Sequence, residues 1–218
     1  MPKTWKHFYR NYLPHLNVPG ATYFVTFRLG DALPAHLAEA LHRTFEQEKQ
    51  LIKEKYPHRH IHRIYQAQKR FFVQYDQVLD KAGFGACLLG KYEIAACLEN
   101  TLFSLHRDLY ELLAYSIMPN HVHLLIDTRI QLQRHEGDLH AYQPLWRIMK
   151  RIKGSSSRAI NQQLNRTGPL WQKDSYDHLV RDPREHQRIA HYILQNPVKA
   201  GLAPSWEDHP FTRLLSRE

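Results

Sequence analysis

The spacing of hydrophobic positions along the chain predicts a mixture of strands and amphipathic helices. Residues 20–29 are rich in β-branched and aromatic side chains and predict a first strand. Between residues 34 and 55 the apolar positions recur at near-helical spacing among charges, which predicts an amphipathic helix. The same two spacings predict further elements in this order: a helix at 92–106, strands at 109–116 and 121–127, a helix at 145–164, an extended segment at 171–180 and a helix at 183–195.

The segment 56–75 separates the first predicted helix from the next and is strongly basic with interspersed aromatic residues. Two interpretations stay open, a nucleic-acid surface or a solvated helix cap and loop. Gly83, Gly85 and Gly90 then interrupt the pattern before residue 92. A polar connection without clear periodicity runs from residue 128 to Pro144, and Gly154 with three serines interrupts the helix predicted at 145–164.

Composition limits the class of protein. The 218 residues fit one domain with an insertion, or at most two small domains. With 43% hydrophobic and 11% aromatic residues, the chain has enough apolar material for a packed core, which excludes a disordered chain. Lysine and arginine outnumber aspartate and glutamate by 30 to 21, so the net charge is +9. This balance favours a polyanionic partner, nucleic acid before membrane, with a basic but inert surface as the alternative.

The remaining compositional features indicate a soluble protein in a reducing compartment. Cys87 and Cys97 form no CxxC pair and are interpreted as small core residues rather than as a disulfide framework. Residues 1–7 contain no apolar run of signal-peptide length, and no segment approaches the roughly 20 apolar residues that span a bilayer. We therefore expect a cytoplasmic protein without a membrane segment.

Two histidines on the strand at 121–127 are the first candidates for chemistry. His121 and His123 are two residues apart, so their side chains lie on the same face of a strand and can share one divalent metal. Apolar neighbours on both sides indicate that the strand runs through a core. His60 and His62 repeat the bare pattern between arginines, where a solvated basic turn is the interpretation we favour over a metal site.

The last predicted helix carries the second group of candidates. Asp182 followed by Pro183 is a typical helix start, and Asn196-Pro197 is expected to end the helix or bend away from it. Tyr192 and Asn196 are four residues apart and therefore lie on one face. Asparagine oxygen is a hard ligand suited to Mg²⁺ or Mn²⁺, and tyrosine can act as a nucleophile toward phosphorus. Taken singly, the tyrosine is a core residue and the asparagine a helix-end residue.

The combination of these motifs resembles a known family. Pro119-Asn120-His121-Val122-His123 on a strand, followed by Tyr192-x-x-x-Asn196-Pro197-Val198-Lys199-Ala200-Gly201 on a late helix, is similar to the HUH single-tyrosine transposases of the insertion-sequence-200 type. Within them it is similar to the branch associated with repetitive extragenic palindromes (REP). The similarity covers most of the chain and includes residues 23–27, 150–157 and 171–177.

The resemblance implies a fold and a site. The fold would be α+β, a ferredoxin-like domain whose central antiparallel sheet is flanked by helices, with residues 1–218 forming one HUH endonuclease domain. Residues 34–90 exceed the minimal domain and would form a helical insertion of unassigned role. Tyr192 would be the nucleophile, and His121, His123 and Asn196 would bind Mg²⁺ or Mn²⁺. Asn196 is preferred to Gln195, whose side chain points about 100° away around the helix.

The resemblance also implies a reaction and a partner. A metal-dependent DNA transposase would cleave and rejoin single-stranded hairpin DNA through a 5′-phosphotyrosine, acting as a monomer or a homodimer. The alternative is a DNA-hairpin-binding protein without essential catalysis, and an unrelated RNA-binding ferredoxin-like domain is a third possibility. Tyr176 is a weaker candidate for the nucleophile. The residues expected to contact DNA are Lys150, Arg151, Lys153, Arg158, Arg181 and Lys199, with Trp171 either stacking on a base or packing in the core.

Overall fold

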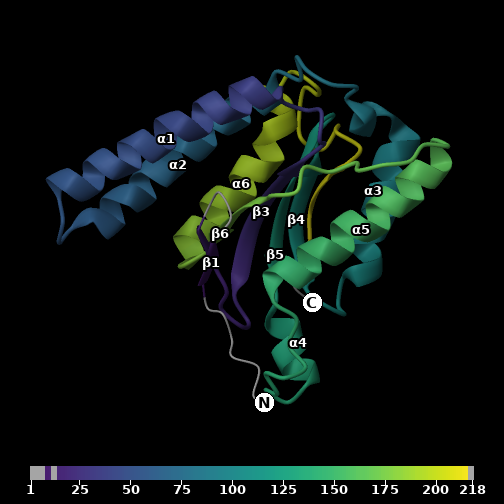
Figure 1. The fold of residues 1–218 in the computed structure, drawn as a ribbon. Helices are drawn as coiled ribbons and strands as arrows, with labels where there is room; N and C mark the ends of the chain where they lie inside the picture. The colour runs from purple at the N-terminus through teal and green to yellow at the C-terminus, as the bar shows by residue number, and fades with distance from the viewer. Residues whose placement is uncertain (1–7, 11–13, 216–218) are drawn as a thin grey trace.

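The computed structural model describes residues 8–10 and 14–215, which are organised around one antiparallel sheet (Figure 1). Five strands form this sheet in the order β6-β3-β5-β4-β7, and each neighbouring pair is antiparallel. Their bounds are Thr22–Arg28 for β3, Glu111–Ile117 for β4, His121–Asp127 for β5, Tyr176–Leu179 for β6 and Thr212–Leu214 for β7. A separate two-stranded sheet pairs β1 (Phe8–Arg10) with β2 (Pro14–Leu16). The prediction made for residues 1–7 lies outside the described ranges.

Helices connect and cover the strands. Their bounds are Ala35–Lys55 for α1, His60–Asp80 for α2, Tyr92–Leu105 for α3, Arg129–Arg134 for α4, Leu145–Gln163 for α5 and Pro183–Lys199 for α6, with a short 3-10 helix η1 at Leu88–Gly90. None of these helices combines the length and the apolar composition that crossing a bilayer requires, within the described part of the chain.

The connectivity confirms the predicted ferredoxin-like α+β class. The elements β3, α3, β4, β5, α5 and β6 follow one another as strand, helix, two strands, helix and strand. In the sheet, the fourth of these strands lies beside the first, then come the third and the second, which is the ferredoxin-like order. The hairpin of α1 and α2, together with η1, is inserted between β3 and α3, in the region where the sequence predicts a helical insertion.

The two faces of the sheet are covered by different helices. Because side chains alternate along a strand, Val122, Leu124 and Ile126 of β5 point into the larger core with the apolar stripes of α3 and α5. Leu125 points to the other face, into a smaller core with Phe72 of α2 and Ile193 of α6. His121 and His123 share the parity of Leu125, so they lie on the face that α2 and α6 cover.

The hairpin α1–α2 extends away from the sheet at its turn and packs against it at its base (Figure 1). Phe45, Ala67 and Phe71 form a small core between the two helices. At the base, Arg28 of β3 donates from Nε to the Tyr75 hydroxyl at 2.6 Å, and Asn120 donates from Nδ2 to the Leu79 carbonyl at 3.0 Å. These contacts attach the end of α2 to the strands beside the histidine pair.

Three local predictions differ from the structure. Most of residues 56–75 is α-helical, with the turn confined to residues 56–59, so the cap-and-loop interpretation and the placement of His60 and His62 in a turn were wrong. The polar connection after β5 contains α4. Helix α5 continues through Gly154, because Ile148, Ile152 and Ile160 keep an apolar stripe in the core.

Helix α6 also continues where a break was expected. Asp182 caps it as predicted, accepting a hydrogen bond from the Glu185 amide at 2.8 Å. Pro197 lies inside the helix, which ends at Lys199 rather than near Gln195. The proline removes one backbone donor, but the Ala200 amide still donates to the Asn196 carbonyl at 3.0 Å, and Pro197 itself is buried. Asn196 therefore keeps helical geometry, one turn beyond Tyr192.

Candidate functional site

The histidine pair of β5 lies in the interior, and hydrogen-bond partners fix the orientation of both rings. His121 and His123 are both 0% exposed, and their Nε2 atoms are 3.0 Å apart. The opposite nitrogen of each ring has a partner: His121 Nδ1 is 2.7 Å from Asn120 Oδ1, and His123 Nδ1 is 2.7 Å from Thr26 Oγ1. Such contacts fix ring orientation in metal sites. Both Nε2 atoms are therefore presented toward one point.

Burial determines the charge of these rings. It lowers the pKa of His121 to about 3, and burial together with the neighbouring His121 lowers the pKa of His123 well below its ordinary value. Both imidazoles are neutral at physiological pH, which is the form that binds a metal ion.

Helix α6 brings Tyr192 and Asn196 to the same point, as their spacing predicts. Asn196 is 1% exposed, and its Nδ2 lies 2.7 Å from His123 Nε2. Its Oδ1 has no hydrogen-bond partner among the described residues. The half-buried Tyr192 ring stands edge-on to His123, with the ring centroids 5.6 Å apart.

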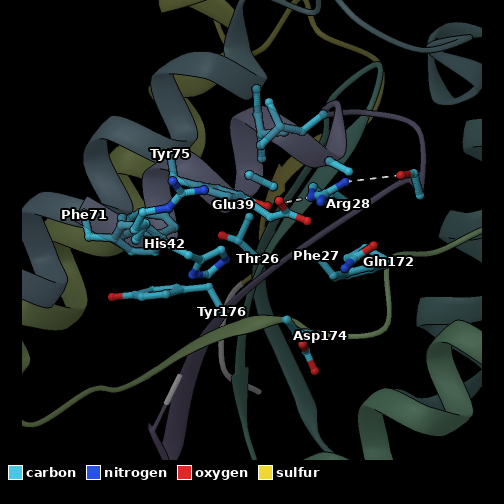
Figure 2. A pocket seen from close by; sticks show the side chains of 18 residues that line it. Thr26, Phe27, Arg28, Glu39, His42, Phe71, Tyr75, Gln172, Asp174 and Tyr176 are labelled. Atoms are coloured by element: carbon cyan, nitrogen blue, oxygen red, sulfur yellow. Dashed lines mark hydrogen bonds between the residues drawn. The ribbon is translucent and has the colours of Figure 1, made fainter. Parts of the chain in front are cut away.

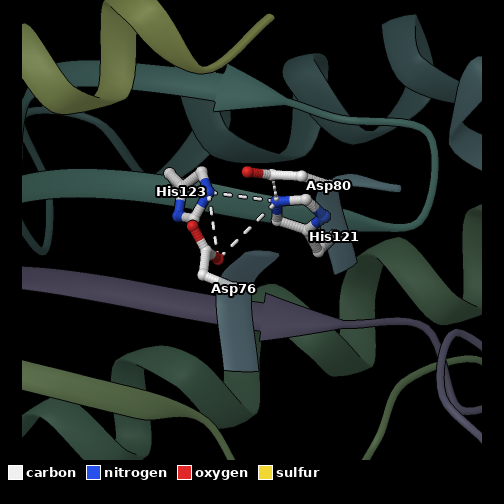
Figure 3. Close-up of side chains that lie close together, drawn as sticks. All are labelled: Asp76, Asp80, His121 and His123. Carbon is white, nitrogen blue, oxygen red and sulfur yellow. Dashed lines mark hydrogen bonds and ion pairs between the residues drawn. The ribbon is translucent and has the colours of Figure 1, made fainter. Parts of the chain in front are cut away.

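Two carboxylates of the inserted hairpin complete the cluster and were missed by the sequence analysis (Figure 3). Asp76 of α2 is 1% exposed, and its Oδ1 lies 3.5 Å from His123 Nε2 and 3.9 Å from His121 Nε2. Its Oδ2 accepts a hydrogen bond from the Tyr192 hydroxyl. Asp80, one turn further along α2, places Oδ1 3.6 Å from His121 Nε2. The spacing of four was a usable signal, but nothing in the sequence indicates that α2 packs against β5.

Burial makes the negatively charged form of these two carboxylates unfavourable. Burial, followed by the charge of Asp80, raises the pKa of Asp76 well above its ordinary value. Burial raises the pKa of Asp80 to about 6. Asp76 Oδ1 and Asp80 Oδ1 have no hydrogen-bond partner within the described ranges.

The donor set fits a divalent cation. Neutral imidazole nitrogens, carboxylate oxygens and an amide oxygen suit Mg²⁺, Mn²⁺ and related ions, and the ligand atoms of Asp76, Asp80, His121 and His123 lie within 4.8 Å of one another. The buried oxygens without partners are the atoms that a cation would satisfy. A divalent metal is therefore compatible with the site, and its identity stays a prediction.

Lys199, one of the predicted DNA-contacting residues, lies beside this cluster. Its exposed side chain places Nζ 5.1 Å from the centroid of the Tyr192 ring. Its charge lowers the pKa of Asp76 and Asp80 against the larger effect of burial. A positive charge beside the tyrosine suits the approach of a phosphate.

The other predicted contacts lie elsewhere. Lys150, Arg151 and Arg158 are exposed on α5, which covers the opposite face of the sheet. Lys153 is less exposed and donates from Nζ to the carbonyls of Gln172, Lys173 and Asp174, at 2.9, 3.1 and 3.1 Å.

Two further candidates have structural contacts. The Arg181 guanidinium lies 4.1 Å from the centre of the Tyr65 ring. Trp171 is 8% exposed, packs edge-on against Phe27 and donates from Nε1 to Ser156 Oγ at 3.0 Å. Of the two roles considered for Trp171, these contacts favour core packing over stacking on a base.

Tyr176, the weaker nucleophile candidate, stacks on Phe72 with centroids 4.1 Å apart, and burial raises its pKa.

Comparisons with known proteins agree with the motifs. Residues 91–196 match the family model described as "Transposase IS200 like". A protein of Haemophilus influenzae named as a REP-associated tyrosine transposase is 29% identical over 106 residues, which cover 47% of this chain and 58% of the relative. The chain thus spans less than two thirds of that relative's length.

A solved structure is also similar. It is a REP-associated tyrosine transposase bound to a REP hairpin, with a TM-score of 0.43 and 14% identity over 94% of this chain and 80% of that one. The family match begins at α3 and ends at Asn196, so it includes the histidine pair, the tyrosine and the asparagine but not the hairpin that carries Asp76. The resemblance carried by the motifs is confirmed over residues 91–196, which match the IS200-like transposase model.

Proposed function

We propose that this chain cleaves and rejoins single-stranded DNA containing hairpins of the REP type, through a covalent 5′-phosphotyrosine at Tyr192. The observation that carries the proposal is the convergence of the Tyr192 hydroxyl, the two histidines and Asn196 on one buried point beside Asp76. The family match and the similarity to a REP-associated relative support the choice of substrate.

The residues that would hold the metal ion are His121, His123 and Asn196, and Asp76 and Asp80 face the same point. When bound, a divalent cation supplies charge stabilisation for the phosphate oxygens as the bond to phosphorus forms. The neutral imidazoles leave their Nε2 lone pairs for this purpose, and Asn120 and Thr26 hold the rings in position.

The chemistry at Tyr192 follows from its hydrogen bond. A phenol with an ordinary pKa of about 10 is a weak nucleophile at neutral pH, so its proton needs an acceptor. Asp76 Oδ2 accepts the hydrogen bond from that hydroxyl and is placed to take the proton. The Tyr192 oxygen forms a bond to phosphorus, the bond from phosphorus to the 3′ oxygen breaks, and the leaving oxygen takes a proton from water to become a 3′-hydroxyl.

Rejoining reverses the same steps. A 3′-hydroxyl of a second strand loses its proton to water and bonds to the phosphorus of the phosphotyrosine. The bond from phosphorus to the Tyr192 oxygen breaks, and that oxygen recovers its proton from Asp76. The covalent link conserves the energy of the phosphodiester bond, so no nucleotide triphosphate is needed. Lys199, beside the Tyr192 ring, is placed to attract the phosphate in both directions.

The test uses single-stranded DNA hairpins with unpaired flanks, end-labelled and incubated with Mn²⁺, followed by denaturing gel electrophoresis. We expect a covalent adduct with the unmodified chain and with Tyr176→Phe, and none with Tyr192→Phe or after chelation of the metal. An adduct that persists in Tyr192→Phe would overturn the assignment of the nucleophile. Tight hairpin binding with no adduct under any divalent metal would favour the alternative, a hairpin-binding protein without essential catalysis.

A further inference from the structure

A cavity of about 510 Å³ lies where the base of the hairpin α1–α2 meets β3 and the segment that leads into β6 (Figure 2). Its volume is within the range of pockets that bind small molecules, roughly 300–1,000 Å³. The proposed reaction does not use this space, and the family match does not include the hairpin that forms much of it.

Flat side chains line much of the cavity. Phe71 and Tyr75 of α2, His42 of α1 and Tyr176 of β6 contribute rings, and Figure 2 shows them around one side of the space. Tyr75 is fixed by the hydrogen bond from Arg28, and Phe71 by its stacking on Phe45 at 4.9 Å. The aromatic lining is therefore held by other contacts and does not depend on a ligand for its position.

Polar groups lie among the rings and at the mouth. Gln172 and the carboxylates of Glu39 and Asp174 line the cavity, and Glu39 is exposed to solvent. The backbone of residues 172–174 is held in place by the ammonium group of Lys153. Flat faces with hydrogen-bonding groups at the edge suit a planar heterocycle better than an aliphatic ligand.

The cavity is next to the candidate catalytic site. Thr26 lines it, and the Thr26 hydroxyl is 2.7 Å from His123 Nδ1. Phe72 also lines it, and the Phe72 ring is 6.2 Å from the ring of Tyr192. Only one layer of side chains, which includes Thr26 and Phe72, separates the cavity from the site. A nucleotide that adjoins the attacked phosphate would lie at such a distance.

We propose that this cavity binds an unpaired base of the single-stranded DNA, next to the phosphate that Tyr192 attacks. The inference rests on the proposed function for the identity of the strand. Stacking on aromatic side chains is the usual way in which proteins hold unpaired bases, and it tolerates any base because every base has a flat face. The inserted hairpin then has a substrate-binding role besides supplying Asp76.

The test measures the binding of two labelled single DNA strands of 12 nucleotides by fluorescence anisotropy in the presence of a chelator. One strand consists of thymidines and the other of abasic sites. The two strands share their phosphates and differ in bases. Ala38→Trp fills the cavity from α1, Ala35→Trp obstructs its mouth from an exposed position, and Ala40→Trp adds the same side chain outside it on the same helix. Thermal unfolding verifies that each variant is folded.

We expect the unmodified chain and Ala40→Trp to prefer the thymidine strand, and this preference to fall by about fivefold or more in Ala38→Trp and Ala35→Trp. Loss of stacking of one base is worth a factor of that size or greater. An equal preference in all four proteins would overturn the proposal. If the protein forms the adduct but the base preference is the same in all variants, only the base-binding cavity is contradicted. If the preference depends on the cavity but no adduct forms, only the proposed chemistry is contradicted.

Discussion

Strand β5 and the hairpin α1–α2 each contain a His-x-His sequence, and the backbone conformation points the two side chains in different directions in the two regions. On β5, successive side chains point to opposite faces, so His121 and His123 share a face and their Nε2 atoms lie 3.0 Å apart. On α2, two residues correspond to about 200° of rotation, so His60 and His62 point in different directions. His60 Nδ1 lies 2.7 Å from the Pro57 carbonyl oxygen, and His62 is exposed. The same three-residue pattern brings two imidazole nitrogens to one point on the strand and not on the helix.

The two regions also differ in burial. Every residue of β5 is buried, whereas the far end of the hairpin exposes Leu51 at 64% and Ile61 at 78%. The hairpin nevertheless contributes to the site, because its base packs on the sheet and places Asp76 beside the histidines. The part of the hairpin that packs on the sheet therefore has a proposed role in the site, and the exposed part at the turn has none.

The largest difference is expected in stability. Leu124→Ala removes a fully buried side chain of β5 and should lower the free energy of unfolding by about 2–5 kcal/mol. Leu51→Ala removes an exposed side chain of α1 and should change it by less than about 0.5 kcal/mol. Urea denaturation followed by circular dichroism measures both. Similar losses in the two variants would show that the hairpin tip is covered in solution.

The next largest difference is expected in metal affinity. His123→Ala deletes one imidazole and should weaken Mn²⁺ binding by about 100-fold or more, since even the loss of a supporting contact typically costs 10–100-fold. His62→Ala makes the same change on α2 and should leave the affinity unaltered. Isothermal titration calorimetry with Mn²⁺ measures both affinities without requiring DNA. A weakening in His62→Ala would contradict the assignment of the site to β5.

A smaller effect is expected from the hairpin residue that reaches the site. Asp76→Asn keeps the shape of the side chain but removes its charge, and should weaken Mn²⁺ binding by about tenfold. Glu48→Gln removes a carboxylate of α1 that pairs with Arg70 at the surface, and serves as the matched control. If Asp76→Asn binds Mn²⁺ normally yet forms less adduct, Asp76 serves Tyr192 alone.

The smallest effect concerns the contacts of Glu185, which link α6 to the hairpin and to residues 178–181. Glu185 of α6 accepts hydrogen bonds from Lys69 at 2.9 Å and from the Arg181 amide, and lies 3.0 Å from His178. These partners outweigh burial and lower the pKa of Glu185 from 4.5 to about 2. Because the folded value is the lower one, the stabilisation is complete above pH 4.5 and is lost as the pH falls toward 2.

Glu185→Gln should therefore reduce the dependence of the melting temperature on pH between 4.5 and 2, relative to the unmodified chain. Glu48→Gln, at an exposed pair, should leave that dependence nearly unchanged. Equal pH profiles for Glu185→Gln and the unmodified chain would mean that the contacts of the Glu185 carboxylate add nothing to stability.

Much of this protein could be read from local sequence patterns. Alternation in β5, the helical stripes of α3 and α5, and the cap at Asp182 are properties of short segments, so their predicted bounds agree with the structure within a few residues. The grouping of His121, His123, Tyr192 and Asn196 followed from two local spacings joined by a family resemblance. Each spacing places two side chains on one face, and the packing of α6 on the sheet brings the two faces together.

Only the tertiary structure decided what residues 34–90 contribute. The periodicity of α2 is the same whether it extends into solvent or packs on the sheet, so the sequence does not reveal that Asp76 meets His123 and Tyr192. The same limit applied at Trp171, where core packing is set by Phe27 and Ser156 from distant parts of the chain. Spacing along one element determines which residues share a face, whereas long-range packing determines what that face meets.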